Sequence, residues 1–422
     1  MYGVHFSEES TCAENLKIYL QLQALPLQPL PQVVNKFISL VKFMTFIKDN
    51  KRIAEIDLIR GFALLGIFLM NIDFMSTDSI LVETWSDNFS NSFDFVLSKI
   101  KFLFLQQRFI GIFSLLFGLS IAIQQQNFKT TGANFTKYYF KRALILSLIG
   151  IVQILFFYMG DILLIYSLLS ILLFCFFKLP NKIILTLAML FFFVPAVFES
   201  IEPYQTLING FANNIKNHYT ASSMTTVFQS GTLLQMMQAR LTEYFYYDFT
   251  GLMWNRTAFA LMLLGYLIGK NNWHTNYLNY WGKLKMVFIV CFLYYATLII
   301  YFFVANVQFG FCVNMAYNIH ILVSITIYVF LILLLYKYSI AKKFTNLISN
   351  VGKTSLSNYV LQGIICAFIF TNYGFGFFTK TTPTQNVLLV ISIYVFQLLI
   401  THFYLRKFKA GPLEFIWRKL AS

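Results

Sequence analysis

Apolar residues gather in long runs along this chain, and short polar stretches separate one run from the next. Most runs approach the roughly 20 residues that an α-helix needs to cross a bilayer core of about 30 Å. They lack strand alternation, and in lipid only helices or closed barrels satisfy every backbone group. The pattern therefore predicts ten membrane-spanning helices, at residues 54–75, 108–124, 143–159, 162–177, 183–198, 249–269, 286–306, 319–336, 355–372 and 387–405.

Composition points to the same class. Of the 422 residues, 58% are hydrophobic and only 12% are charged, about half the charged share of a soluble domain. The five cysteines are scattered without a C-x-x-C pair, so neither a disulfide framework nor a metal site is expected. The predicted fold class is an all-α polytopic integral membrane protein, with residues 52–422 as a single multi-span domain.

The positive charge is distributed unevenly. Ten spans place both termini on one side, and that side carries 24 Lys and Arg residues against 5 on the other. Because Lys and Arg concentrate in cytoplasmic loops, both termini are predicted to be cytoplasmic. The basic residues flank the spans as topology signals do, so the net charge of +15 indicates the lipid bilayer as partner and no nucleic acid.

Three segments lie outside the spans. Residues 1–51 form an N-terminal extension that could be an upstream addition, because Met44 would make a natural start, although the basic amphipathic pattern from Val33 also suits the inner membrane surface. The outer segment 199–248 contains a stretch that suits an interfacial helix. Residues 406–422 form a cytoplasmic tail.

The first span carries polar residues on one face. Asp57 and Arg60 are three residues apart and can pair. Asn71 follows Arg60 by eleven residues, three helical turns or roughly 16 Å along the axis, and Gly61 and Gly66 allow close helix approach. An ionisable group inside a membrane usually faces a bundle interior or a wet cavity. The alternative is that Arg60 extends to the inner headgroups while Asp57 caps the helix.

Other spans also carry polar positions. Arg108 stands at the mouth of the second span, and Arg256 lies about two turns inside the sixth, where it either extends to the headgroups or faces the lumen. Asp161 lies in a tight outer hairpin, where a helix N-cap is the leading interpretation. Asn358 belongs to a polar stripe that could simply join helices. Together with Asp57 and Arg60, these residues are the candidates for substrate or donor binding.

Motifs of soluble enzymes are absent. The sequence contains no P-loop, no H-E-x-x-H, no G-x-S-x-G and no dinucleotide fingerprint. No histidine occurs between residues 6 and 217, and His320 and His402, near span ends, are interpreted as structural.

Seven sequence blocks resemble a known family. They are "EIDLIRGFALLGIFLMNI", "FIGIFSLLFGLS", "KRALILSLIGIVQ", "GDILLIYSLLSI", "LMLLGYLIGK", "VGKTSLSNYVLQ" and "GPLEFIWRKL". In this order, from about Arg52 to Leu420, they resemble the YeiB family of bacterial inner-membrane proteins, a domain of unknown function. The resemblance implies a multi-pass protein of the bacterial cytoplasmic membrane.

This family is distantly similar to transmembrane acyltransferases. In those that O-acylate polysaccharides, a histidine follows the first-helix arginine by eleven residues, and Asn71 stands there in this chain. In heparan-type enzymes an Asn occupies that place and a histidine follows in the first outer loop, which here has none. Acyl transfer gains roughly 10²–10⁴-fold from a general base. Asn71, as an oxyanion donor, and Asp73, as a substitute base, are therefore the catalytic candidates.

Three hypotheses follow. The first is an acyltransferase-like protein that moves an acyl group from a cytoplasmic donor such as acyl-CoA, a co-substrate rather than a bound cofactor, to an envelope or lipid acceptor. The second is a transporter or flippase of a small or lipid-like solute, although no inverted repeat is visible. The third is a non-catalytic membrane protein.

Overall fold

The computed structural model describes residues 53–77, 89, 93–131, 134–198, 221–250, 252–275, 277–304 and 311–421. The chain divides into two units, Met1–Asn50 with Lys129–Ala133 and Lys51–Phe128 with Asn134–Ser422. Except for residues 129–131, the described residues belong to the second unit. The predicted extension at residues 1–51 lies outside the described residues.

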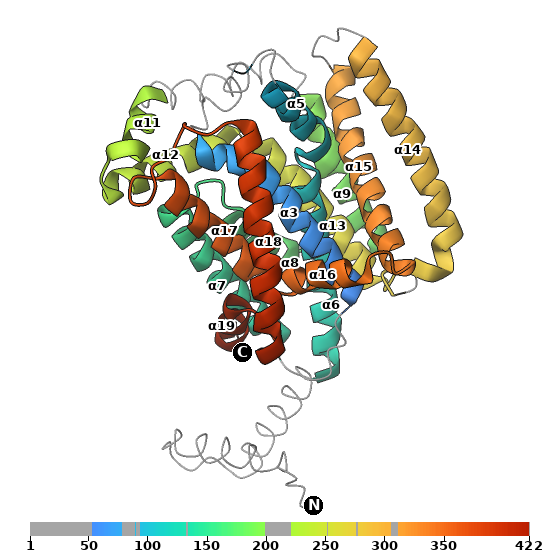
Figure 1. Ribbon diagram of the computed structural model, residues 1–422. Coiled ribbons are helices and arrows are strands. Elements are labelled where there is room, and N and C mark those ends of the chain that lie inside the picture. The colour runs from blue at the N-terminus through green and yellow to red at the C-terminus, as the bar shows by residue number, and fades with distance from the viewer. Residues whose placement is uncertain are drawn as a thin grey trace, which may run out of the picture. The chain divides into compact units, whose positions relative to one another are not determined.

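The described part of the chain is helical and contains no strand, which confirms the predicted all-α class (Figure 1). A single 3-10 turn, η2 (Tyr277–Tyr280), interrupts the series. The helices are α3 (Ala54–Ser76), α5 (Phe93–Leu105), α6 (Arg108–Thr131), α7 (Phe135–Phe156), α8 (Ile162–Phe174), α9 (Asn181–Phe198), α11 (Ala221–Ser230), α12 (Leu233–Thr250), α13 (Leu252–Lys270), α14 (Trp281–Val304), α15 (Phe311–Lys337), α16 (Lys342–Lys353), α17 (Ser355–Phe370), α18 (Pro383–Lys407) and α19 (Pro412–Ala421).

Each of the ten predicted spans coincides with a helix. Five segments are long and apolar enough to cross a membrane, namely Ala54–Ser76, Phe93–Lys129, Phe135–Phe156, Asn318–Lys337 and Pro383–Lys407. Three shorter apolar helices accompany them, at Ile162–Phe174, Asn181–Val194 and Ser355–Phe370. The chain is therefore a membrane protein by the character of its helices, while the count of ten crossings and the cytoplasmic termini stay predictions.

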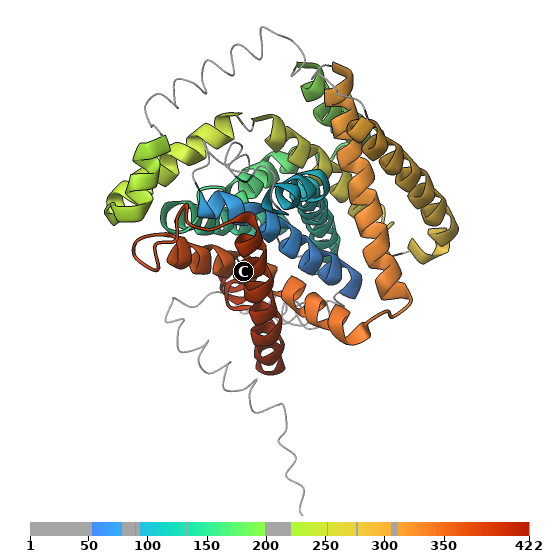
Figure 2. The same ribbon diagram turned by 45° about the horizontal axis from the view of Figure 1, so that its top comes forward.

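Helix α3 lies inside the bundle and contacts α16, α17 and α18 (Figures 1 and 2). Its central residues are apolar on every face, which is the pattern of an enclosed helix, and its polar residues lie towards its two ends. Ala63, Leu64 and Ile72 are fully buried. Polar side chains on this helix therefore face protein and not lipid.

Two glycines set the close contact between α3 and α16. A Cβ atom at Gly61 would overlap the carbonyl oxygen of Ile348, and one at Gly352 would overlap the carbonyl oxygen of Asp57. Gly66, on the next turns of α3, leaves room for the Phe109 ring of α6. The expectation that Gly61 and Gly66 permit close helix approach is confirmed.

Two of the helices outside the ten predicted spans lie between the eighth and ninth spans and after the tenth. Helices α16 and α19 are short, each with one apolar and one polar face. Helix α19 lies within the predicted tail 406–422 and packs against α7 and α17. Helix α12 covers the stretch predicted to be interfacial, in the segment 199–248.

Candidate functional site

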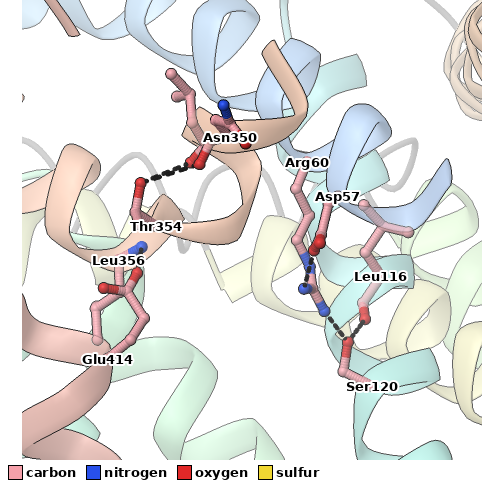
Figure 3. A network of polar contacts seen from close by, with 9 residues as sticks. Asp57, Arg60, Leu116, Ser120, Asn350, Thr354, Leu356 and Glu414 are labelled. Atoms are coloured by element: carbon pink, nitrogen blue, oxygen red, sulfur yellow. Dashed lines mark hydrogen bonds and ion pairs between the residues drawn. The ribbon is translucent and has the colours of Figure 1, made fainter. Parts of the chain in front are cut away.

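The first polar cluster lies at the beginning of α3, on the predicted cytoplasmic side. Asp57, which is 4% exposed, accepts a hydrogen bond of 3.3 Å from Nη1 of Arg60. The other guanidinium nitrogen donates to the hydroxyl of Ser120 on α6, and this hydroxyl donates to the Leu116 carbonyl (Figure 3). The predicted pair is confirmed, and the Arg60 side chain points to a neighbouring helix while remaining 27% exposed.

The same end of α3 contacts the η2 turn. The Tyr277 hydroxyl donates to a Glu55 carboxylate oxygen at 3.2 Å. Burial, followed by the neighbouring negative charge of Glu55, raises the pKa of Tyr277. This tyrosine therefore stays protonated and keeps its hydrogen bond at neutral pH.

A second arginine, Arg142 on α7, joins this cluster. Its guanidinium donates to the amide oxygen of Gln124 and lies 3.9 Å from the ring centre of Trp417 on α19. The Trp417 indole N–H in turn donates to the Arg142 carbonyl at 2.9 Å. The groups that Arg142 contacts here are uncharged. The positive charges of Arg60 and Arg418 lie close enough to repel its guanidinium. Arg142 thus has no carboxylate among these contacts, and other arginines lie near it.

A small cavity opens between these side chains. Its volume of about 20 Å³ is enough for about one water molecule. The polar side chains that line it are Ser120, Gln124, Tyr139, Arg142, Ser170 and Trp417. Arg142 lines this cavity, and Arg60 reaches its wall through the hydrogen bond to Ser120. Guanidinium groups suit phosphate and carboxylate geometry, so the two arginines beside this cavity are the candidate anion-binding groups.

The closing block "GPLEFIWR" holds this arrangement together. Glu414, 6% exposed, accepts a hydrogen bond from the backbone N–H group of Leu356 at 2.8 Å (Figure 3). It also accepts from the backbone N–H group of Ser357 at 3.2 Å and from the Ser357 hydroxyl at 2.5 Å. The preceding residue Thr354 provides no side-chain cap. Glu414 therefore caps α17 from another helix and anchors α19, which carries Trp417 to Arg142.

Replacing Glu414 by alanine is expected to lower the free energy of unfolding by about 2–3 kcal/mol. The change removes a charged acceptor and leaves buried N–H groups at the start of α17 without a partner. Denaturant unfolding in detergent micelles measures it, with Lys409→Ala, exposed just before this block, as the control. Equal stability of Glu414→Ala and Lys409→Ala would contradict the capping role.

The other end of α3 carries a second polar cluster. Asp73 forms an ion pair of 2.5 Å with Lys101 of α5, a lysine that is 4% exposed. Asn386 of α18 donates to Asp73 at 3.0 Å and to the Ser76 hydroxyl at 2.9 Å. Asn71, two residues before Asp73, is 7% exposed, and its amide makes no hydrogen bond with the described residues. The two catalytic candidates therefore lie about three turns from Arg60, in a separate cluster.

The remaining predicted site residues do not join these clusters. Asp161 accepts hydrogen bonds from the N–H groups of Leu163 and Leu164 at 2.9 and 3.0 Å, which confirms it as the N-cap of α8. Arg108, 1% exposed, donates to the Gln106 carbonyl at the start of α6. Arg256 is half-buried on α13.

Asn358 lies in a seam between α17 and α18. Its amide donates to the Thr354 hydroxyl at 2.7 Å and to the Thr401 hydroxyl at 3.3 Å. Gln397 donates to the Asn358 carbonyl at 2.8 Å, and Gln362 donates to Gln397 at 2.9 Å. The stripe thus joins two helices, as polar side chains do in membrane bundles.

Sequence reasoning missed several residues that the tertiary structure gathers. Arg142 and Trp417 complete the cavity, and their signal was present in the blocks "KRALIL" and "GPLEFIWR". At the outer end, Tyr158 lies within electrostatic range of Glu243, Asp161 and Asp73. Among the described residues, no group of three or more His, Cys, Asp or Glu could hold a metal ion.

Comparison with known proteins places the chain among uncharacterised relatives. It is 26% identical to the uncharacterised protein YxaH of Bacillus subtilis over 392 residues, 87% of this chain and 94% of the relative. It is 24% identical to an uncharacterised 39.9 kDa protein of Bacillus acidopullulyticus over 380 residues, 88% of this chain and 94% of the relative. It is also 35% identical to the uncharacterised protein YeiB of Escherichia coli over 78 residues, 18% of this chain and 20% of YeiB.

The family match lies in the second half of the chain. Residues 268–422 match the model of a protein family of unknown function, DUF418. No solved structure matches the chain at a significant level. The matched region contains α17, α18 and the "GPLEFIWR" block that anchors Trp417. Residues 268–422 are thus similar to the DUF418 family of unknown function, and the chain is similar to uncharacterised bacterial proteins that include YxaH and YeiB, with helices apolar enough to cross a membrane.

Proposed function

We propose that this protein is acyltransferase-like and moves an acyl group from a cytoplasmic thioester donor, such as acyl-CoA, to an envelope or lipid acceptor. The observation that carries the proposal is that Arg142 lines a polar cavity at the predicted cytoplasmic end of α3 and that Arg60 binds Ser120 in the wall of the same cavity. An acyl-CoA carries several phosphates. The guanidinium groups of Arg60 and Arg142 match the phosphates of such a donor.

The opposite end of α3 supports the acceptor half of the reaction. The acceptor hydroxyl oxygen bonds to the thioester carbonyl carbon, the carbon–sulfur bond breaks, and the hydroxyl proton passes through a base to the leaving thiolate. In this proposal Asp73 takes the proton, and Asn71, whose amide makes no hydrogen bond with the described residues, donates to the developing oxyanion. The ion pair with Lys101 holds Asp73 in place for this role.

The alternative function is transport or flipping of a small or lipid-like solute. It is favoured by the buried ion pair of Asp73 and Lys101, because ionisable groups inside membrane bundles often mark solute or proton pathways. The two functions differ in their products, since transport leaves the solute chemically unchanged.

The decisive experiment is acyl-CoA binding to the purified protein in nanodiscs. Wild type is expected to bind saturably, and Arg60→Ala and Arg142→Ala are each expected to weaken binding about tenfold or more, because each removes charge-assisted hydrogen bonds to phosphate. Lys137→Ala is the matched control, since it removes an exposed cation from the same helix as Arg142.

Absence of binding to folded wild type would overturn the donor site and make solute-flux assays in liposomes the next step. Equal weakening in all three variants would show that only general surface charge matters. Where wild type binds, mass spectrometry of the cell envelope with and without the protein then tests for an acylated product.

A further inference from the structure

A groove lies at the other end of α7 from the cavity that Arg142 lines. It is formed by the end of α7, the α11–α12 junction and the loop after α17. Its volume is about 490 Å³, within the range of small-ligand sites. The residues that line it are mostly apolar: Phe156, Phe157, Leu233, Met236, Asn372 and Tyr373. Figures 1 and 2 show α11 and α12 at this edge of the helices, away from α14 and α15.

A buried arginine lies directly behind the groove wall, hydrogen-bonded to the lining residue Tyr373. Arg240 is 2% exposed and lies one helical turn after Met236. It donates to the Leu155 carbonyl at 3.3 Å and to the Tyr373 hydroxyl at 3.2 Å. The Tyr373 hydroxyl donates onward to the Phe156 carbonyl at 3.0 Å. Two residues that line the groove, Phe156 and Tyr373, are thus tied to this guanidinium.

The partners of Arg240 in the described part of the chain are neutral. Besides the carbonyl and the hydroxyl, it faces the Phe228 ring at 5.4 Å, and no described carboxylate forms an ion pair with it. A guanidinium has five N–H donors, and these contacts use two of them. A buried charge without a counter-charge is costly unless a ligand supplies one.

We infer that this groove binds the acyl chain of an anionic phospholipid, with the lipid phosphate directed to Arg240. The apolar walls suit a hydrocarbon chain, and the guanidinium suits a phosphate, so the combination selects an anionic amphiphile. The groove lies at the end of α7 predicted to be outermost, so the lipid comes from the outer leaflet. Binding of this lipid to the groove does not depend on the proposed acyl transfer. The further step, that this lipid is the acyl acceptor, rests on the proposed function.

The test is photo-crosslinking of the full-length protein in phosphatidylcholine nanodiscs, without acyl-CoA. Two probes carry the same diazirine-labelled chain, one on phosphatidylglycerol and one on phosphatidylcholine. We expect mass spectrometry to place the label on groove residues such as Leu233 and Tyr373. Labelling by the anionic lipid should exceed that by the zwitterionic lipid roughly tenfold, as one charge-assisted contact allows.

Three variants sharpen the result. Arg240→Gln should abolish the preference for the anionic lipid, and Leu233→Trp, at a position 49% exposed on the groove wall, should reduce labelling by both lipids. Lys380→Gln, which removes an exposed cation from the α17–α18 loop, should change neither. Equal labelling of wild type by both lipids, or an unchanged preference in folded Arg240→Gln, would overturn the inference. If Arg240→Gln fails to fold, undiminished labelling of Leu233→Trp would do so.

Discussion

Replacing Lys101 by methionine is expected to lower the free energy of unfolding by about 3–5 kcal/mol. The lysine is 4% exposed and pairs with Asp73 at 2.5 Å, so its loss leaves a largely buried carboxylate without its counter-charge. Asn386 still donates to Asp73, but one neutral donor does not replace a full charge. Denaturant unfolding in detergent micelles, monitored by tryptophan fluorescence, measures the loss.

A double-mutant cycle isolates the ion pair. Lys101→Met combined with Asp73→Asn should recover much of the lost stability, because it removes the buried charge altogether. Lys99→Met, at an exposed lysine two residues away on α5, should change stability by less than about 0.5 kcal/mol. A double variant no more stable than Lys101→Met would show that the pair is not the source of the loss. A folded double variant that still transfers acyl groups would exclude Asp73 as the base.

Replacing Gly352 by alanine is expected to cost about 3 kcal/mol and to weaken donor binding as well. The new Cβ would overlap the backbone oxygen of Asp57, and no side-chain rotation can relieve a backbone overlap. Helix α16 must move away from α3, which displaces Asp57 and therefore its partner Arg60. Unfolding and acyl-CoA binding, measured on the same preparation, report both effects.

Gly282→Ala is the matched control. This glycine lies near the start of α14, where an added Cβ meets no atom within 4 Å. The substitution should therefore be neutral or stabilise slightly, since alanine is the better helix former by about 1 kcal/mol. If Gly352→Ala were as stable as Gly282→Ala, the close contact of α3 with α16 would not be essential for the fold.

Local patterns were sufficient for the helices and for contacts within one helix. Each predicted span falls on a helix because apolar length and the absence of strand alternation act over a single segment. The pairing of Asp57 with Arg60 was predictable because a spacing of three residues puts both side chains on one face. The N-cap role of Asp161 followed in the same way from its place before an apolar run.

Contacts between distant segments were not predictable in this way. Nothing near Arg142 in the sequence indicates that Trp417, 275 residues later, donates to its carbonyl. Asp73 finds Lys101 on α5 and Asn386 on α18 only after these helices pack together. The burial of Arg240 against an uncharged carbonyl and hydroxyl could likewise be seen only in the tertiary structure.

The sequence by itself determined the class of the protein, because apolar length and charge asymmetry are properties of the chain alone. It also determined the polar positions on the first span. Only the tertiary structure decided that Arg60 binds Ser120 in the wall of the cavity that Arg142 lines, and that Glu414 caps α17 from another helix. The physical reason is that a helix specifies its own face by its period of 3.6 residues. Which faces meet depends instead on side-chain shape and on close-approach glycines such as Gly61 and Gly352, which act between segments far apart in the chain.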